Sequence, residues 1–235
     1  MKAFLYGLGL QFRLDIRSKT MLVTCYLVPL LFFFFMSGIF VSVDPAAGET
    51  LISSMSVFVV TMSALIGLPP SLGEVYGGEV KKVYKANGVP LSLGVVTQFI
   101  SCFLHTFIVC LIIFAVAPPA FGAELPRGLP LWFCSLAALL CVTLAAGCLL
   151  GLLIRSQAKQ TMAAMLLFLP SVILSGIMFP ASMLPAFLRY AAFAFPATIG
   201  FGAMTASAVW QLPVLAGEFA ALAFAIALVL RRMYR

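Results

Sequence analysis

GEVYGGEVKKVYKANGVP, residues 73–90, is a long charged interruption in a very apolar sequence. Its charged side chains are Glu74, Glu79, Lys81, Lys82 and Lys85. Each would cost roughly 3 kcal/mol at the centre of a bilayer, so the stretch must lie outside the hydrocarbon core. Apolar runs precede and follow it, and the stretch therefore fixes the side of the membrane on which these two runs meet.

The composition is that of an all-α integral membrane protein. Hydrophobic residues make up 63% of the 235 residues, charged residues make up 9%, and the mean hydropathy is +1.16. A spanning helix needs about 20 mostly apolar residues. Six such spans are expected, and they leave no room for a soluble domain, so 1–235 forms a single transmembrane domain. The predicted spans are 20–42, 51–72, 89–116, 130–154, 160–180 and 212–230.

The basic residues are distributed unevenly between the loops. All 14 except Arg127 and Arg189 fall in the two terminal segments or in the second and fourth loops. Cytoplasmic loops carry an excess of Lys and Arg, so both termini are expected in the cytoplasm. The net charge of +7 thus reflects topology and does not indicate a nucleic-acid partner.

The first 19 residues are expected to form a helix in the membrane interface. Arg13, Asp15 and Arg17 interrupt the apolar run, so 1–19 does not read as a cleavable signal. Apolar side chains share one helical face and basic ones lie on another, a pattern typical of interfacial helices. The apolar face consists of Phe4, Leu5, Leu8, Phe12 and Ile16.

Prolines, small residues and aromatics mark the ends and contacts of the spans. Pro69-Pro70 is expected to end the second span, and Pro118-Pro119 to lie in a stiff outer loop. Trp132 has the position of an aromatic-belt residue. Gly147 and Gly151 form a GxxxG motif, which permits close contact between helices.

Polar groups within the spans are few. Gln98, Cys102 and His105 are spaced by four and three and share one helical face. Hydrogen bonding between helices is the favoured interpretation. A proton relay would need an acidic partner, for which Glu218 is the candidate, and a metal site within one chain is not expected because His105 is the only histidine. The hydroxyls of Thr61, Ser171 and Ser175 are candidates for a transport pathway.

The segment 181–211 is long for an outer loop, yet largely apolar with Arg189 as its single charge. Two short helices that dip into the outer leaflet, about 184–194 and 196–208, would satisfy both its backbone and its hydrophobicity. A seventh span would instead place Arg231, Arg232 and Arg235 outside the cell. The sequence therefore predicts a re-entrant helical hairpin before the last span.

Two regions together resemble one known family. Ser175–Pro180 (SGIMFP), then Ser182–Pro185 (SMLP) and Phe195-Pro196, are similar to the fifth span and re-entrant helices of ABC-2 type ABC exporter permeases. Glu74–Ala86 followed by Gly88–Ser92 (GVPLS) resembles the coupling helix of that family. The resemblance covers essentially the whole chain. Coupling segments of the family are often acidic and arginine-rich, whereas this one has lysines and a Gly77-Gly78 pair.

The resemblance implies a type V ABC exporter fold in a bacterial cytoplasmic membrane. Two copies of a separate ATPase subunit, which bind ATP and Mg²⁺, would dock on the coupling helix 74–86. A second permease subunit, identical or paralogous, would face the second and fifth spans. The implied coupling residues are Glu74, Glu79, Lys81, Lys82, Tyr84 and Lys85. The implied outer gate and re-entrant residues are Phe179, Pro180, Met183, Pro185 and Pro196.

The sequence itself contains no GxxxxGK[ST] phosphate loop, so the chain is expected to be neither an enzyme nor a cofactor-binding protein. A hydrophobic or amphiphilic substrate is expected: a drug, a peptide antibiotic, a lipid or a lipid-linked molecule. The alternative is an autonomous ion-coupled transporter or channel, with His105 and Glu218 as its ionisable groups. A membrane enzyme would need a catalytic set, and no such set is evident.

Overall fold

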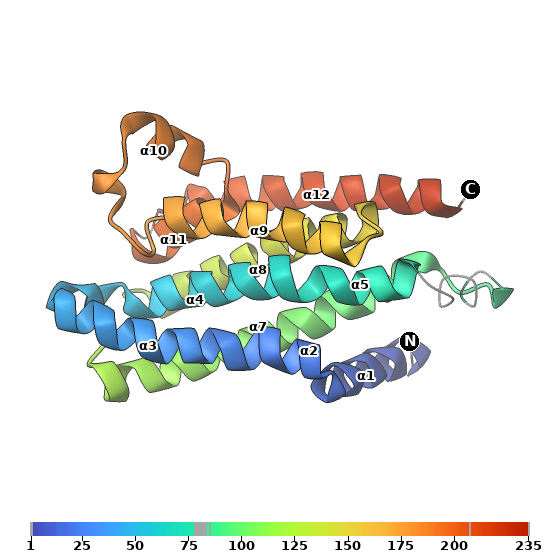
Figure 1. Cartoon of the computed structure of the whole chain (residues 1–235), viewed down its shortest axis with the longest axis horizontal. Coiled ribbons are helices and arrows are strands. Elements are labelled where there is room, and N and C mark those ends of the chain that lie inside the picture. The colour runs from blue at the N-terminus through green and yellow to red at the C-terminus, as the bar shows by residue number, and fades with distance from the viewer. Residues whose placement is uncertain (1, 78–83, 85, 207, 235) are drawn as a thin grey trace.

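The computed structural model describes residues 2–77, 84, 86–206 and 208–234. All regular elements among these residues are helices, and six helical segments are long and apolar enough to cross a membrane. The expected all-α architecture with six spans is therefore confirmed. The spans form one elongated bundle, and both chain termini lie near the same end of it (Figure 1). We call this the terminal end.

The six spans and the elements between them differ in regularity. A first helix, α1 (Lys2–Arg17), precedes the spans. The spans are α2 (Lys19–Leu22), η1 (Val23–Leu27) and α3 (Val28–Val43); α4 (Leu51–Met62), η3 (Ser63–Gly67) and α5 (Leu68–Gly77); α7 (Leu91–Phe121); α8 (Leu129–Leu153); α9 (Gln157–Leu174); and α12 (Gln211–Tyr234). The short connecting helices are η2 (Pro45–Glu49), η4 (Ala181–Met183), α10 (Ala186–Ala192) and α11 (Pro196–Thr205).

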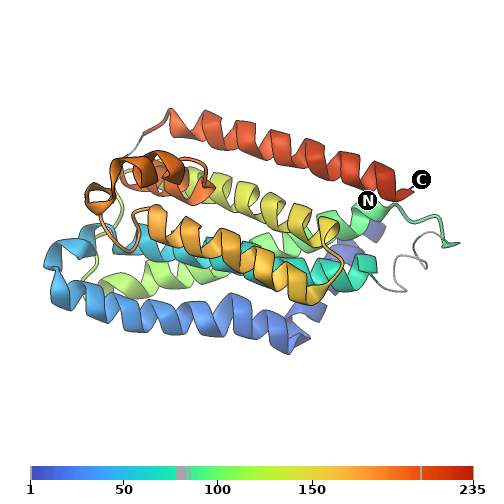
Figure 2. The same cartoon turned by 45° about the horizontal axis from the view of Figure 1, so that its top comes forward.

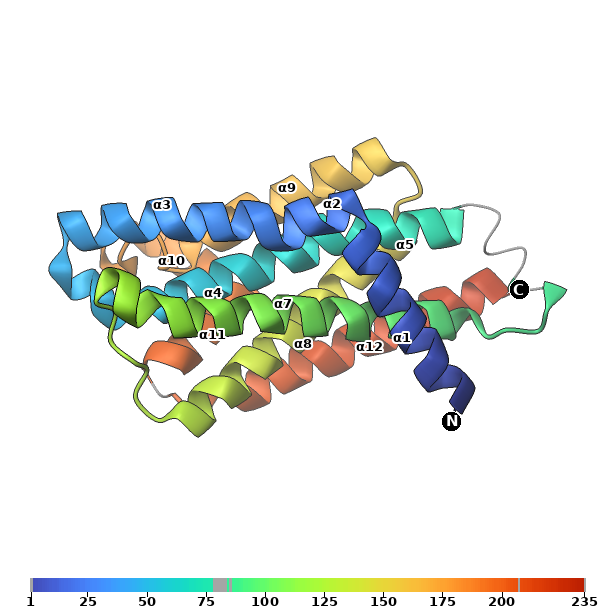
Figure 3. The same cartoon turned by 90° about the horizontal axis from the view of Figure 1, so that it is seen from below.

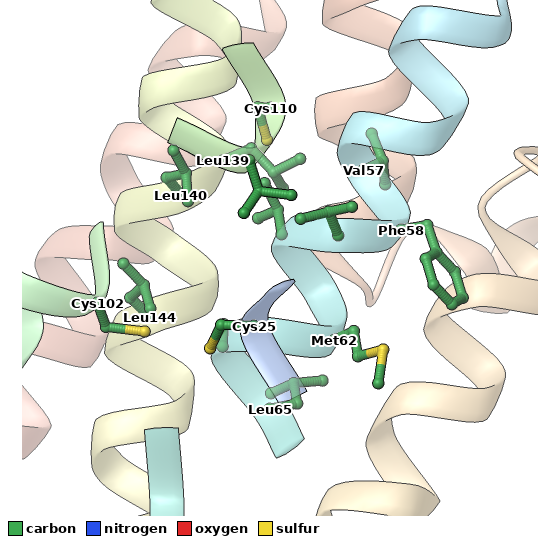
Figure 4. Packing of buried hydrophobic residues seen from close by; sticks show 14 of the residues in the cluster. Cys25, Val57, Phe58, Met62, Leu65, Cys102, Cys110, Leu139, Leu140 and Leu144 are labelled. Carbon is green, nitrogen blue, oxygen red and sulfur yellow. The ribbon is translucent and has the colours of Figure 1, made fainter. Parts of the chain in front are cut away.

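The helix α4 forms the centre of the bundle. All 12 of its residues are buried, and it packs against α3, α7, α8, α9 and α11. Val57, Phe58 and Met62 of α4 belong to the same buried cluster as Leu139 and Leu140 of α8 (Figure 4), and the ring of Phe58 points away from α8 and contacts Phe168 of α9. The expectation that the second span faces a partner subunit is therefore wrong for α4, because its own chain already covers it.

The second span does not end at Pro69-Pro70, as the sequence suggested, but continues as α5 to Gly77. A π-helical turn, η3, precedes the two prolines, and within it the N–H of Leu68 donates to the carbonyl of Ser63. The prolines then occupy the first turn of α5, where a missing N–H is tolerated. A wide turn thus allows the span to pass through a proline pair.

The GxxxG motif of α8 packs on this turn. A Cβ atom at Gly147 would overlap the carbonyl oxygen of Ala64, and one at Gly151 would lie 3.0 Å from the carbonyl oxygen of Pro69. Only glycine allows the two backbones to approach so closely. The close helix contact expected from the motif is therefore present, and it joins α8 to η3 and α5.

Two expectations at the opposite end are corrected. Pro118-Pro119 belongs to α7, which continues to Phe121 and ends at Gly122 with a left-handed φ of 66°. Trp132 is only 1% exposed, and its Nε1–H donates to Oγ of Ser53 at 2.9 Å. It is a core residue rather than a belt residue, because a buried serine hydroxyl satisfies the polar edge of its indole ring.

The fifth span ends at Leu174, earlier than expected, because Gly176 takes a left-handed φ of 88°. Phe179 and Pro180 therefore follow the helix. Two short helices, α10 and α11, come next, as the sequence predicted, and α11 begins at Pro196. Of these, α11 packs against α8, α12, α4 and α9, so it is part of the bundle rather than an exposed loop.

We predict that Gly147→Ala destabilises the protein by about 1–3 kcal/mol, the usual cost of overpacking. The added methyl group would collide with the Ala64 carbonyl, which is backbone and cannot rotate away. Thermal unfolding in detergent measures the effect. Gly217→Ala is the matched control, because no atom lies within 4 Å of a Cβ there. Equal unfolding midpoints for the two variants would contradict the close contact.

Candidate functional site

A cavity of about 370 Å³ lies within the bundle, between the second, fourth, fifth and sixth spans and α11. It brings together four of the residues singled out from the sequence, namely Thr61, Ser171, Pro196 and Glu218. Ser175, the third pathway candidate, is buried and donates to the carbonyl of Val172 at 3.0 Å. It is not among the described residues that line the cavity.

The cavity is mostly apolar. Its walls come from α4, η3, α8, α9, α11 and α12 and from the bend between α10 and α11. The lining residues are Thr61, Leu65, Thr143, Ala146, Leu167, Ser171, Ala194, Phe195, Pro196, Ala197, Glu218, Ala221 and Leu222. Small-molecule pockets have this character, apolar with a few polar groups.

Part of the lining is open to the surroundings of the bundle. Leu167 of α9 and Ala221 of α12 are both exposed. Figure 2 shows α12 and α9 on either side of α8, with α10 and α11 at one end. The opening therefore faces the region where a membrane would lie, rather than either aqueous side.

The carboxylate of Glu218 is the ionisable group of this cavity. Its atom Oε2 is buried and has no hydrogen-bond partner among the described residues. A polar atom buried without a partner costs roughly 1–3 kcal/mol, and more when it is charged. From the sequence, Glu218 was a candidate for a proton relay or for an ion-coupled pathway with His105. Its place beside Thr61 and Ser171 depends on the packing of α12 against α8.

The residues expected at the outer gate lie near the opposite end of the bundle from the chain termini. Phe179 is 55% exposed and Met183 is 72% exposed. Pro180 and Pro185 are the residues directly before η4 and α10. Of the expected set, Pro196 alone lines the cavity among the described residues. Phe179 and Met183 thus lie at the surface, whereas Pro196 lies in the cavity wall.

A second polar cluster, which sequence analysis missed, joins α1 to α7. Asp15 is only 5% exposed. Its carboxylate accepts hydrogen bonds from Gln11 at 2.8 Å, Ser101 at 2.5 Å and Gln98 at 3.4 Å. Asp15 lies between Arg13 and Arg17 in the sequence and so resembled a surface charge. Its spacing of three from Phe12, on the face that meets α7, was the available signal.

His105 belongs to the same region. Its Nδ1 atom hydrogen-bonds with the Tyr26 hydroxyl at 2.6 Å, and its ring stacks on Phe12 with centroids 4.2 Å apart. Gln98, Cys102 and His105 are all buried, and α1 crosses α7 (Figure 3). The favoured interpretation, hydrogen bonding between helices, is confirmed for Gln98 and His105, whereas Cys102 hydrogen-bonds with Thr106 within α7. The acid beside His105 is Asp15 rather than Glu218, which lines the separate cavity.

The charged segment 74–86 is described only in part. Glu74 is exposed on the last turn of α5. Tyr84 is half-buried, and one of its ring atoms would lie 3.3 Å from a Cβ at Gly94 of α7, so its ring packs inward. Glu79, Lys81, Lys82 and Lys85 lie outside the described residues, and so does most of the expected coupling helix.

One buried glutamine holds three spans together beside this segment. Gln160 of α9 is 1% exposed, and its Nε2 donates to the carbonyls of Gly151 at 3.2 Å and Ile154 at 2.6 Å. It thereby caps the end of α8. A Cβ at Gly73 would lie 2.7 Å from the same Nε2 atom, so α5 passes directly over the side chain just before Glu74.

Among the described residues, no three His, Cys, Asp or Glu side chains cluster closely enough to hold a metal ion. An apolar cavity with a carboxylate lies inside a bundle of six spans, and a charged segment follows the central span at the terminal end.

The fold and cavity define a multi-pass membrane protein with an internal binding space. The family model of the ABC-2 type transporter matches residues 8–209, and the chain belongs to this family. It is thus an ABC transporter permease, the membrane component rather than an ATPase, and the family implies association with an ABC ATPase subunit. No curated protein and no solved structure matches the chain.

We predict that Ser101→Ala destabilises the protein by about 1.5–3 kcal/mol, because it removes a hydrogen bond to the buried, charged Asp15. Ser92→Ala, the same change at an exposed position of α7, should shift stability by no more than about 0.5 kcal/mol. Denaturant unfolding in detergent micelles compares the two. If Ser101→Ala matches Ser92→Ala, the Asp15 cluster contributes little to the docking of α1.

Proposed function

We propose that this permease is half of the membrane part of an ATP-driven exporter in a bacterial cytoplasmic membrane. Two ATPase subunits, which would bind ATP and Mg²⁺, dock on the segment 74–86, and a hydrophobic or amphiphilic substrate moves outward. The terminal end of the bundle faces the cytoplasm in this proposal, in agreement with the basic residues of both terminal segments.

The observation that carries the proposal is the continuity of the second span. It is helical from Leu51 to Tyr76, about 39 Å at 1.5 Å per residue. Thr61 and Leu65 line the cavity near its middle, and Glu74 begins the charged segment at its end. A displacement of that segment would therefore reach the cavity through one continuous helix.

The π-helical turn gives this helix a defined place to bend. Ser63–Gly67 begins two residues after Thr61, contains the cavity residue Leu65 and precedes the charged segment, and such turns occur frequently at functional sites. Gln160 adds a second connection, since it contacts α8 and the region of Gly73 together. Movement of the inner segment would thus shift the second, fourth and fifth spans as a group.

A second permease subunit, identical or paralogous, would pack on the face of α9. This span has the lowest mean hydropathy of the six, 1.2, although a row of its apolar side chains is exposed. The row consists of Met162, Met165, Leu166, Leu169 and Ile173. A span that faces lipid is usually more apolar. Phe179 and Met183 continue this surface, which suits an outer gate between two subunits.

The alternative, an ion-coupled transporter or channel, uses His105 and Glu218 in one pathway. The two residues belong to different clusters, because His105 contacts Phe12 and Tyr26 whereas Glu218 lines the cavity with α8, α9 and α11 residues. Ion-driven flux by the purified chain alone would favour this alternative.

We expect the tagged chain, purified from its native membrane in mild detergent, to bring an ABC ATPase with it. Replacing Glu79 and Lys82 with alanine should lower ATP hydrolysis by the complex by about tenfold, the effect of losing roughly 1.4 kcal/mol of docking free energy. Glu124→Ala with Arg127→Ala is the matched control, with the same charges and spacing in the outer loop. A chain recovered alone, without ATPase activity, would overturn the exporter proposal.

Gln160→Leu should weaken coupling between ATP hydrolysis and transport by about two- to thirtyfold, the range of coupling changes of 0.5–2 kcal/mol. The variant loses both bonds to the end of α8. Gln157→Leu, at an exposed position of the same helix, should leave the ratio of substrate moved to ATP hydrolysed unchanged. Equal ratios for the two variants would remove Gln160 from the mechanism.

A further inference from the structure

The cavity presents hydrogen-bond acceptors to whatever enters it. Its three hydroxyl groups each donate within their own helix, Thr61 to Val57 at 2.7 Å, Thr143 to Leu139 at 2.7 Å and Ser171 to Leu167 at 2.7 Å. Their oxygens retain lone pairs for a further bond. The fourth polar side chain, Glu218, is also an acceptor when ionised. A ligand that satisfies this set must therefore be a donor.

The charge of the cavity also favours a ligand that donates hydrogen bonds. None of the described residues that line it is basic, and Oε2 of Glu218 has no partner among the described residues. The N-terminus of α11, at Pro196 and Ala197, borders the cavity. Its partial positive charge is roughly half an elementary charge and so offsets only part of the carboxylate. The remaining charge favours a cation.

The rest of the lining selects the body of the ligand. Nine of the lining residues are apolar, and the volume of about 370 Å³ falls among small-molecule pockets. Exposed Leu167 and Ala221 place the opening toward the membrane region, so a ligand dissolved in the bilayer could enter laterally. A strongly hydrated ion would have to lose its water on this route, whereas a lipophilic molecule would not.

We propose that this cavity binds lipophilic amines, with the carboxylate of Glu218 as counter-ion to the ammonium group and the apolar lining around the hydrocarbon body. The two ammonium N–H groups that a primary amine has left can donate to two of the three hydroxyl oxygens of Thr61, Thr143 and Ser171. That such amines are the exported substrates rests on the proposed function. Their binding to the permease does not, because the cavity is formed within one chain.

The test is binding of dansylcadaverine, a fluorescent primary amine, to the purified chain in phosphatidylcholine nanodiscs. Its N-acetylated form has the same fluorophore and linker without the charge. We expect saturable binding of the amine, weakened about ten- to hundredfold by Glu218→Gln, the range for a hydrogen bond to a charged group. Binding of the acetylated form should be weak and unchanged by that variant. Glu124→Gln, at an exposed outer-loop position, should bind both probes as the wild type does.

A second variant tests the place of binding. Ala221→Phe fills the cavity from α12 without altering its charge and should abolish saturable binding of the amine. Equal affinity of the wild type for the two probes, or an unchanged affinity of Glu218→Gln for the amine, would overturn the proposal. So would the absence of saturable binding. Amine binding by a chain that recruits no ATPase would keep the site and reject the exporter, whereas recovery of an ATPase without amine binding would reject the site alone.

Discussion

The contact between Gly147 and the Ala64 carbonyl is the constraint on which the rest of the bundle depends. A helix inside a bilayer must satisfy its backbone polar groups internally, yet the second span contains Pro69 and Pro70, which offer no N–H. In the π-helical turn before them, the N–H of Leu68 donates to the carbonyl of Ser63. Gly147 and Gly151 then let α8 lie directly on this irregular backbone, so the central span is both covered and able to bend.

The carboxylates of Asp15 and Glu218 illustrate two ways of tolerating charge. Asp15 is surrounded by donors from Gln11, Gln98 and Ser101, and its role is to hold α1 on α7. Glu218 has a buried oxygen without a partner among the described residues, and it lines a cavity. A saturated carboxylate stabilises a fold, whereas an unsaturated one is available to a ligand.

The proposed function requires that a displacement of the charged segment 74–86 be transmitted to the cavity. The second span lines the cavity with Thr61 and with Leu65 of the π-helical turn, and it leads into the charged segment. Gln160 joins that span to the ends of its neighbours. Packed helices of this kind tend to move as groups rather than deform continuously. The proposed export cycle therefore needs no element beyond those that stabilise the resting fold.

The sequence by itself determined the six spans, the two short helices before the last one, and the family, because hydropathy, proline and glycine act over short distances along the chain. It misjudged Trp132 and Pro69-Pro70 and did not single out Asp15. The hydroxyl partner of Trp132 and two of the donors to Asp15, Gln98 and Ser101, come from residues distant in sequence, and hydropathy does not mark the π-helical turn before Pro69. Only the tertiary structure decided that the second span is central and that Thr61, Ser171, Pro196 and Glu218 share one cavity. The physical reason is that in a membrane every long span is apolar on all sides, so the side that faces protein is set by side-chain packing and not by hydrophobic pattern.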